Sequence, residues 1–349
     1  MRSSYRAEDV TLLLKDITGL VEPLPAKERE ARIQSGTHYC EMLPAEYVPT
    51  APYMEAYRRA LATQADATAA AVRQTADRLA AEKGGDIVLV SLARAGIPVG
   101  ILLKWDLRAR YGIDAPHYAV SIIRGRGIDH NAMRYLLARY RPGQLQFVDG
   151  WIGKGAILGE LERELAAYPG VSPALAVLSD PANLTRLCGT HEDILIPSSC
   201  LNCTVSGLIS RTFLRHDLIG PEDFHGAAYY GALAAEDRSY EFLDAIRARL
   251  ACAPALPDRP LTGTGLEEAQ AIAAHFGVTD INLVKPGIGE ATRVLLRRLP
   301  WKLLVRTGET EDGALAHLFQ LAREKGVPVE AYPMTHYRAC GIIRQLADT

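Results

Sequence analysis

The stretch Gln146-Phe-Val-Asp-Gly-Trp-Ile-Gly-Lys-Gly-Ala-Ile157 decides the fold of this chain. It reads as the end of an apolar strand, an acidic residue, a glycine-rich turn and the start of a helix that continues over 158–165. Such a turn leaves backbone N–H groups unpaired at a helix N-terminus, which favours phosphate binding. Asp149 would repel a phosphate, so we expect it to contact sugar hydroxyls or a bridging Mg²⁺. The stretch predicts a site for a phosphorylated sugar; a tight turn without a ligand is the alternative.

Two common nucleotide-binding motifs do not fit this stretch. A Walker A loop needs Gly-Lys-Ser/Thr five residues after its first glycine, but Gly155 is followed by Ala156 where the lysine should stand. The dinucleotide motif needs a third glycine, and Leu158 occupies that position.

Two further strand–turn–helix units precede this stretch. Residues 86–92 read as a buried strand that ends at Ala93-Arg94-Ala95-Gly96, with an apolar helix over 97–110. Residues 117–123 read as another strand, which ends in the loop Arg124-Gly-Arg-Gly-Ile-Asp129. Because the carboxyl ends of parallel strands share one edge of a sheet, we expect the three turns to meet at one ligand site. Arg94 can offer a fork of donors to phosphate, and Arg124 and Arg126 are expected to lie in a mobile loop.

This order of elements resembles the type I phosphoribosyltransferases. More narrowly, Ser-Leu-Ala-Arg-Ala-Gly-Ile-Pro at 91–98, Ser-Ile-Ile-Arg-Gly-Arg-Gly-Ile-Asp at 121–129 and the stretch at 147–157 closely resemble the StiP family. That family, once labelled as cysteine proteases and later reinterpreted as phosphoribosyltransferase-like, is associated with tellurite-resistance stress gene clusters. The resemblance implies an α/β fold with a type I phosphoribosyltransferase-like parallel sheet and a hood over the acceptor.

The activity implied is transfer of ribose 5-phosphate from phosphoribosyl pyrophosphate (PRPP) to a base-like acceptor, releasing pyrophosphate, in the synthesis of a nucleoside-like stress metabolite. Asp149, Arg124 and Arg126 would be catalytic, and Asp149 would hold Mg²⁺ with PRPP. The residues that would bind PRPP are Arg94, Ala95, Gly96, Gly150, Trp151, Ile152, Gly153, Lys154, Gly155 and Ala156. Gly150 replaces the family's second acid, and Gly153 and Ala156 replace its hydroxyl residues. A degenerate loop of this kind also permits an RNA-binding regulator that senses PRPP or a nucleotide without catalysis.

The hood is expected to come from two polar segments, 35–44 and 188–206. The candidates for acceptor binding are His38, Glu41, His191, Glu192 and Asp193. Surface or helix-capping roles are the alternative for these side chains.

A Pro/Gly-rich linker over 253–265 separates a first domain, 1–252, from a second, 266–349. The second half predicts strands near 281–284, 301–306 and 327–331, and a final helix. The stretch Lys285-Pro-Gly-Ile-Gly-Glu-Ala-Thr-Arg293 resembles the Pelota and kink-turn-binding proteins, which implies a small α/β/α domain that binds RNA. The candidate RNA-binding residues are Gly287, Gly289, Glu290, Arg293 and Arg297. An ordinary solvated helix face is the alternative.

Composition sets the remaining bounds. The net charge of −2 argues against bulk attraction to nucleic acid. No apolar run approaches the roughly 20 residues of a membrane span, and no secretory segment begins the chain, so we expect a cytoplasmic protein. Both a monomer and a homodimer are compatible with the sequence.

Cys200 and Cys203 lack a second ligand pair for zinc. A thiol hydrolase using Cys200, with His191 as the nearest base, is a further alternative.

Overall fold

The first half of the chain is built on a parallel sheet. The computed structural model describes residues 1–257, 261–311 and 313–345. Six strands pair in the order β1 (Thr11–Leu12), β4 (His117–Val120), β3 (Val88–Leu92), β7 (Leu145–Val148), β8 (Leu175–Ser179) and β9 (Cys188–Thr190). Every neighbouring pair is parallel. The predicted α/β class with a parallel sheet is confirmed, and the strands expected from the apolar runs lie where the sequence placed them.

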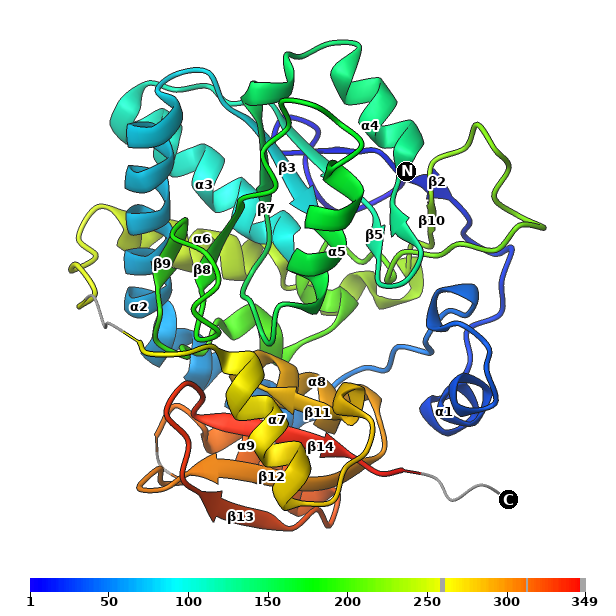
Figure 1. Ribbon diagram of the computed structural model, residues 1–349, viewed down its shortest axis with the longest axis vertical. Coiled ribbons are helices and arrows are strands. Elements are labelled where there is room, and N and C mark those ends of the chain that lie inside the picture. Colours follow the sequence, from blue (N-terminus) through cyan, green and yellow to red (C-terminus); the bar gives the residue numbers. More distant parts are fainter. Residues whose placement is uncertain (258–260, 312, 346–349) are drawn as a thin grey trace.

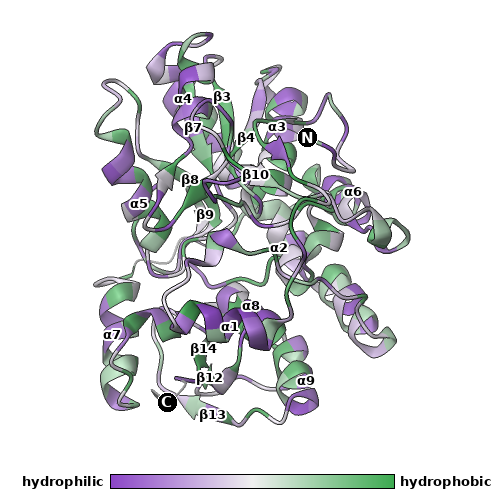
Figure 2. Cartoon of the chain, turned by 90° about the vertical axis from the view of Figure 1, so that its right-hand side faces the viewer, coloured by the Kyte–Doolittle hydropathy of each residue, from purple (hydrophilic) through white to green (hydrophobic). Residues whose placement is uncertain are grey.

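Helices cover both faces of this sheet, which explains why its central strands are continuous apolar runs. One face carries α2 (Ala51–Lys83), α3 (Gly96–Tyr111) and α6 (Ser239–Leu250), and the other carries α4 (His130–Leu137) and α5 (Ala156–Leu165). All five residues of β3 and of β8 are buried. The hydropathy colouring accordingly shows the central strands green inside helices that carry purple on their outer sides (Figure 2).

The second half forms a mixed sheet in the order β11 (Val284–Pro286), β14 (Ala339–Ile343), β12 (Pro300–Arg306) and β13 (Val329–Tyr332). It packs with α7 (Gly265–His275), α8 (Ile288–Arg297) and α9 (Ala316–Glu324), below the first sheet in Figure 1. The predicted final helix is wrong, because β14 runs between β11 and β12 with all five residues buried. A short apolar run reads equally well as a buried strand or a buried helix, so periodicity could not decide.

Five smaller elements also belong to the first half. β2 (Lys15–Asp16) pairs with β10 (Gly226–Ala227), and β5 (Ile122–Ile123) forms a hairpin with β6 (Gly127–Ile128). The helix α1 (Ala26–Gln34) stands apart from the first sheet, to the right of the second half in Figure 1.

One of the apolar clusters runs across both halves. The long helix α2 packs on β8 and β9 of the first sheet and on α9 of the second half. One cluster of buried side chains accordingly includes Leu79 and Leu102 of the first half together with Leu303 and Leu318 of the second. Among the described residues, no helix has the length and apolar character needed to cross a membrane.

Candidate functional site

A cleft of about 590 Å³ opens where the carboxyl ends of β3 and β7 face the second half. Its walls come from the glycine-rich turn, from α1, from Tyr39 and Arg124, and from residues 280–298 of the second half. Nine of the predicted ligand-binding or catalytic residues line it together: Ala95, Arg124, Asp149, Trp151, Ile152, Gly153, Lys154, Gly155 and Ala156. The strand ends therefore do converge on one hollow.

Asp149 is the acid of this cleft. Its carboxylate accepts a hydrogen bond from the backbone N–H of Gly150 at 2.8 Å. Burial raises the pKa of Asp149 to about 6, against the opposing effects of that hydrogen bond and of the nearby Arg293 charge. Among the described residues, Asp149 belongs to no group of three potential metal ligands. A Mg²⁺ there would have to take its remaining ligands from a bound molecule, and the predicted Mg²⁺ site stays a prediction.

The glycine-rich turn is docked on the second half. The ammonium of Lys154 donates to the carbonyl oxygens of Ile281 and, at 2.8 Å, of Val284. Burial lowers the pKa of Lys154 to about 8. The ring of Trp151 lies against Gly289, and the Arg293 guanidinium carbon is 4.4 Å from the ring centroid. Lys154 and Trp151 were both predicted to contact a phosphorylated ligand. In the structure, their side chains contact the second half instead and hold the two halves together.

The Arg124–Arg126 loop, predicted to be mobile, is held in a tight hairpin. The Glu160 carboxylate of α5 accepts from the N–H groups of Gly125 at 2.7 Å and Gly127 at 3.0 Å. Arg124 donates to Asn282 at 2.9 Å, and Arg126 pairs with Glu41 at 3.0 Å. Only Arg124 of the two arginines lines the cleft.

Arg94 does not reach the cleft, contrary to its predicted role in pyrophosphate binding. Its guanidinium is buried, donates to the carbonyl oxygen of Ile209 and pairs with Glu46 at 2.9 Å. Gly96 is closed off as well, because a Cβ there would overlap the carbonyl oxygen of Val148.

The two segments expected to form a hood take different positions. His38 caps a short helical turn next to the hairpin, with its Nδ1 3.0 Å from Cys40 Sγ and its Nε2 3.1 Å from the Arg124 carbonyl oxygen. Burial lowers the pKa of His38. The first residues of the other segment, 188–206, do not belong to a hood. Cys188–Thr190 forms the edge strand β9 of the first sheet.

Asp193 caps a helix of the second half. Its carboxylate accepts from the backbone N–H of Ile288, at the start of α8, at 3.1 Å and from that of Arg338 at 2.9 Å. Burial raises the pKa of Asp193 to about 6. The capping alternative therefore holds for Asp193, while Glu192 contributes a carbonyl oxygen to the hydroxyl of Ser179.

His191 lies in a group that the sequence analysis missed. The ligand atoms of Asp180, Cys188 and His191 all lie within 4.8 Å of one another, the one such group of three or more potential metal ligands among the described residues. Cys188 Sγ is 3.6 Å from His191 Nε2, and His191 Nδ1 is 3.0 Å from the carbonyl oxygen and 3.7 Å from the carboxylate of Asp180. The spacing Cys-Gly-Thr-His was visible, but only strand pairing of β8 with β9 brings Asp180 to it.

Burial raises the pKa of each of the other four buried cysteines among the described residues. Burial raises the pKa values of Cys200 and Cys203 to about 12 each. The expected pairing of His191 with Cys200 is replaced by its contact with Cys188. Burial also raises the pKa of Cys40, beside His38, to about 11.

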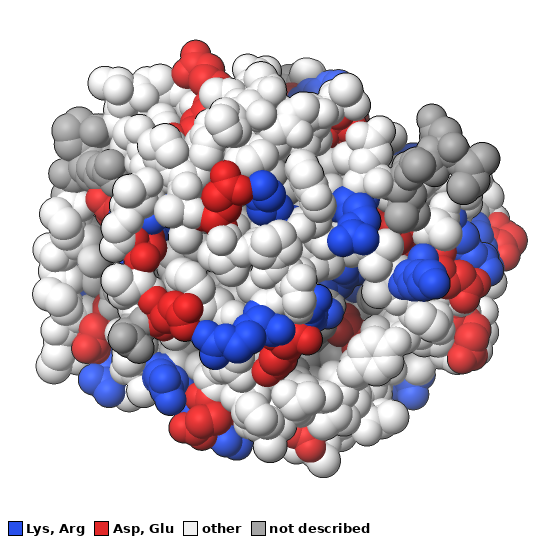
Figure 3. Space-filling view, turned by 90° about the horizontal axis from the view of Figure 1, so that it is seen from below, with Lys and Arg blue, Asp and Glu red and all other residues white. Residues whose placement is uncertain are grey.

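The candidate RNA-binding residues of the second half face inward. Gly287 and Gly289 are buried at the start of α8, and Arg297 donates to Asn202 of the first half. Glu290 and Arg293 pair with each other at 2.9 Å on the wall of the cleft. On the outer face of the second half, basic and acidic side chains are interspersed without a continuous basic surface (Figure 3).

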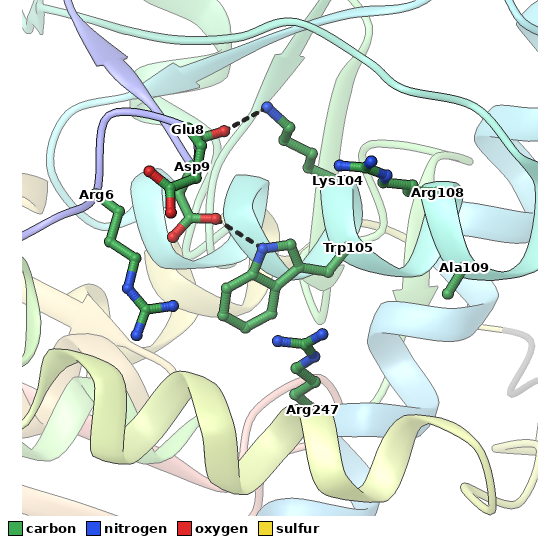
Figure 4. A pocket seen from close by; sticks show the side chains of 8 residues that line it. All are labelled: Arg6, Glu8, Asp9, Lys104, Trp105, Arg108, Ala109 and Arg247. Atoms are coloured by element: carbon green, nitrogen blue, oxygen red, sulfur yellow. Dashed lines mark hydrogen bonds between the residues drawn. The ribbon is translucent and has the colours of Figure 1, made fainter.

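A second hollow, of about 440 Å³, lies between α3 and α6. Figure 4 shows its Trp105 ring between Asp9, which accepts from the indole N–H at 2.8 Å, and Arg247, whose guanidinium carbon is 4.8 Å from the ring. The bonds from Lys104 to the Glu8 carbonyl oxygen and from Trp105 to Asp9 thus fasten the N-terminal segment to α3.

Comparison with known proteins assigns both halves. Residues 3–247 match the family described as tellurite-like stress resistance cysteine protease StiP, and residues 263–345 match the PELOTA RNA binding domain. A protein of Acinetobacter baylyi named cysteine protease StiP is 37% identical over 366 residues, which cover 98% of this chain and 94% of that protein.

These names contradict the predicted phosphoribosyltransferase. Both the family and the relative are named as cysteine proteases, so transfer of ribose 5-phosphate from PRPP, and the regulator that would sense PRPP, are not supported. Two of the cations assigned to PRPP are also engaged within the protein: Lys154 donates to carbonyl oxygens of the second half, and Arg94 pairs with Glu46. The two predicted resemblances are confirmed: the chain belongs to the StiP family and carries a Pelota RNA-binding domain.

Proposed function

We propose that this chain is a thiol-dependent hydrolase whose nucleophile is Cys188, with His191 as the base and Asp180 as the group that orients it. The family's name and that of the relative supply the reaction class. The observation that carries the assignment is the 3.6 Å approach of Cys188 Sγ to His191 Nε2. An enzyme is the class that both names describe, and the residue roles are our own proposal.

The geometry of His191 suits a base. Its Nδ1 faces the Asp180 carbonyl oxygen at 3.0 Å, so an N–H at Nδ1 leaves Nε2 as the unprotonated nitrogen. Cys188 Sγ lies 3.6 Å from Nε2 and 3.8 Å from Nδ1. The Asp180 carboxylate, 3.7 Å from Nδ1, would stabilise the imidazolium that forms when the thiol proton is taken up. Burial raises the pKa of Asp180, while hydrogen bonds from the N–H groups of Leu184 and Thr185 oppose that rise.

Arg78 of α2 supports the thiolate. Its Nη1 lies 3.4 Å from Cys188 Sγ and also donates to the carbonyl oxygens of Cys188 and Arg186. A guanidinium beside a sulfur favours the ionised thiol, which is the nucleophilic form.

The reaction follows from these contacts. Cys188 Sγ attacks the carbonyl carbon of an acyl substrate and its proton moves to His191 Nε2. That proton then passes to the leaving group as the acyl–sulfur bond replaces the scissile bond, and water hydrolyses the thioester. Cys188 has no exposed surface, whereas His191 keeps 16% of its side chain exposed, so the substrate approaches from the histidine and requires a displacement of the chain over the sulfur.

The test is hydrolysis of fluorescein-labelled casein by the purified chain, together with peptide mapping after iodoacetamide treatment. Cys188→Ser and His191→Ala should each reduce turnover by at least about 100-fold. Cys40→Ser is the matched control, because Cys40 is also buried beside a histidine. Full activity of Cys188→Ser, or loss confined to Cys40→Ser, would sink the assignment.

RNA binding by residues 263–345 is a second proposal, favoured by the match to the Pelota domain. Since Gly287 and Gly289 are buried against the first half, RNA would meet this domain at the cleft wall around Arg293 and Lys285. Fluorescence anisotropy with a kink-turn RNA should show binding that weakens with salt. Equal binding by Arg293→Gln would argue against the cleft wall.

The type I phosphoribosyltransferase-like arrangement remains a proposal about architecture alone. The parallel order β4-β3-β7-β8, with a glycine-rich turn after β7, supports it.

A further inference from the structure

One end of the cleft holds an excess of positive charge. Arg29 and Glu30 on α1, Arg211 after the 203–210 segment and Arg298 at the end of α8 meet there, with Arg94 and Arg297 close enough to act on them electrostatically. We call Arg29, Arg211 and Arg298 the arginine cluster. Among the described residues, the carboxylates that pair with or act on these five guanidinium groups are Glu30 and Glu46, so five positive charges minus two negative ones leaves three uncompensated there.

Within the part of the chain that the structure describes, Arg29 and Arg211 have no ionic partner of their own. The guanidinium of Arg298 pairs with the Glu30 carboxylate, with N–O distances of 2.6 and 3.0 Å, and that of Arg94 pairs with Glu46 at 2.9 Å. Arg29 is 4% exposed and its Nε is buried without a hydrogen-bond partner. Arg211 lies over the ring of Tyr39, with 4.8 Å between its guanidinium carbon and the ring centroid.

Such an arrangement is unfavourable without a ligand. Burying a cation away from water costs free energy, and like charges in a poorly solvated site raise that cost. The effect is visible in Arg211, whose pKa is lowered to about 10 by burial and by the charges of Arg29, Arg94 and Arg298. Burial and the charge of Arg298 likewise lower the pKa of Arg29.

We propose that the arginine cluster is a binding site for a phosphate group carrying two or more negative charges, which enters through the cleft. Guanidinium groups match phosphate oxygens with paired donors, and a multiply charged anion offsets the surplus charge. Arg211 and Arg298 line the cleft, so the phosphate reaches them from solvent, while Arg29 supplies charge from behind. The volume of about 590 Å³ leaves room for the molecule to which the phosphate belongs.

This site is separate from the proposed hydrolase. None of Asp180, Cys188 and His191 lines the cleft, so phosphate binding and thiol chemistry can be lost independently.

The primary experiment is calorimetric titration of the full chain with inorganic phosphate. Arg211→Gln and Arg29→Gln should each weaken binding about ten-fold or more. Arg139→Gln is the matched control, because Arg139 also lies over a tyrosine ring, 3.6 Å from the centroid of Tyr135, but outside the cleft. Unchanged affinity in both cluster variants, or no binding by the wild type, would overturn the proposal.

Thermal unfolding separates a ligand site from a structural role. If the cluster exists to bind an anion, Arg211→Gln without phosphate should unfold at the same or a higher temperature than the wild type, because it removes repulsion. The proposal would be overturned by two results together: Arg211→Gln unfolds at a lower temperature than the wild type without phosphate, and added phosphate raises the unfolding temperature of both by the same amount. Arg211 would then have a structural role. Arg211→Lys keeps the charge but loses the paired donors. Its affinity for phosphate should therefore lie between those of the wild type and Arg211→Gln.

Two RNA probes distinguish the source of the phosphate. A 5′-phosphorylated oligonucleotide that binds more tightly than its 5′-hydroxyl counterpart, with the difference lost in Arg211→Gln, identifies an RNA end. If the wild type binds the two oligonucleotides equally and Arg211→Gln still loses its affinity for inorganic phosphate, the ligand is a small phosphorylated compound. Either result upholds the site. Cys188→Ser should bind phosphate like the wild type even if hydrolysis is lost or was never present.

Discussion

The hydroxyl of Tyr337 donates a hydrogen bond to the carbonyl oxygen of Gly153 at 2.7 Å, joining the second half of the chain to the glycine-rich turn of the first. Lys154, the next residue, donates to two carbonyl oxygens of the second half. The turn is therefore an interdomain clamp as well as a wall of the cleft, and it is fixed by contacts that a single-domain reading of its sequence cannot foresee.

Gly289→Ala should loosen this clamp. A Cβ at Gly289 would overlap the indole ring of Trp151, so either the ring or α8 must shift. We expect a loss of about 1–3 kcal/mol in the free energy of unfolding, measured by urea denaturation. Gly159→Ala in α5 is the control: nothing lies within 4 Å of a Cβ there, so alanine should leave stability unchanged or slightly raise it. Equal effects of the two changes would contradict the contact.

Asp149→Asn should stabilise the protein near neutral pH. Because the folded-state pKa of Asp149 is raised to about 6, ionisation of this carboxyl costs stability, and the cost grows as pH rises from the ordinary value of 3.8 through 6. The variant should exceed the wild type by about 1–3 kcal/mol at pH 7.5, with the difference vanishing by about pH 4.

Thermal melts across pH 4–8 measure this difference. Asp244→Asn, at an exposed position on α6, is the comparison and should show no such trend. A pH-independent gap between Asp149→Asn and the wild type would refute the electrostatic explanation.

Arg78→Gln should move the reactivity of Cys188 to higher pH. Removal of the guanidinium 3.4 Å from Cys188 Sγ disfavours the thiolate, and we expect the pH midpoint of alkylation to rise by about one unit. Iodoacetamide labelling followed by peptide mapping gives the rate at Cys188, with the exposed Cys252 as internal reference.

Arg73→Gln supplies the control for Arg78. Arg73 lies on the same helix and donates to the carbonyl oxygens of Ala251 and Ala253, so its loss should leave the Cys188 profile in place. The same shift in both variants would assign the effect to α2 as a whole.

Zn²⁺ should block Cys188. The sulfur, imidazole and carboxylate of the Asp180–Cys188–His191 group are ligands that zinc accepts, and they lie within 4.8 Å of one another. Low-micromolar Zn²⁺ should slow alkylation of Cys188 and spare Cys252, and EDTA should restore the rate. Protection that persists in His191→Ala would show that zinc binds elsewhere.

The sequence predicted the parallel sheet because its strands are short apolar runs closed by glycine turns, as in 86–96 and 145–156. It also predicted that Asp149 and Arg124 would meet, since parallel strand ends share one edge. It failed at Arg94, whose partner Glu46 is 48 residues away, and at 339–343, where five apolar residues fit a strand or a helix.

The sequence by itself determined most of the local elements and the kinship with the StiP family, because these depend on neighbouring residues and on motif order. Only the tertiary structure decided which groups work together. Burial beside Glu46 removed Arg94 from the cleft, the pairing of β8 with β9 brought Asp180 to Cys188 and His191, and the docking of the second half placed Arg298 with Arg29 and Arg211. Charge, desolvation and proximity act through space, and the distances that set them are fixed only when the chain has folded.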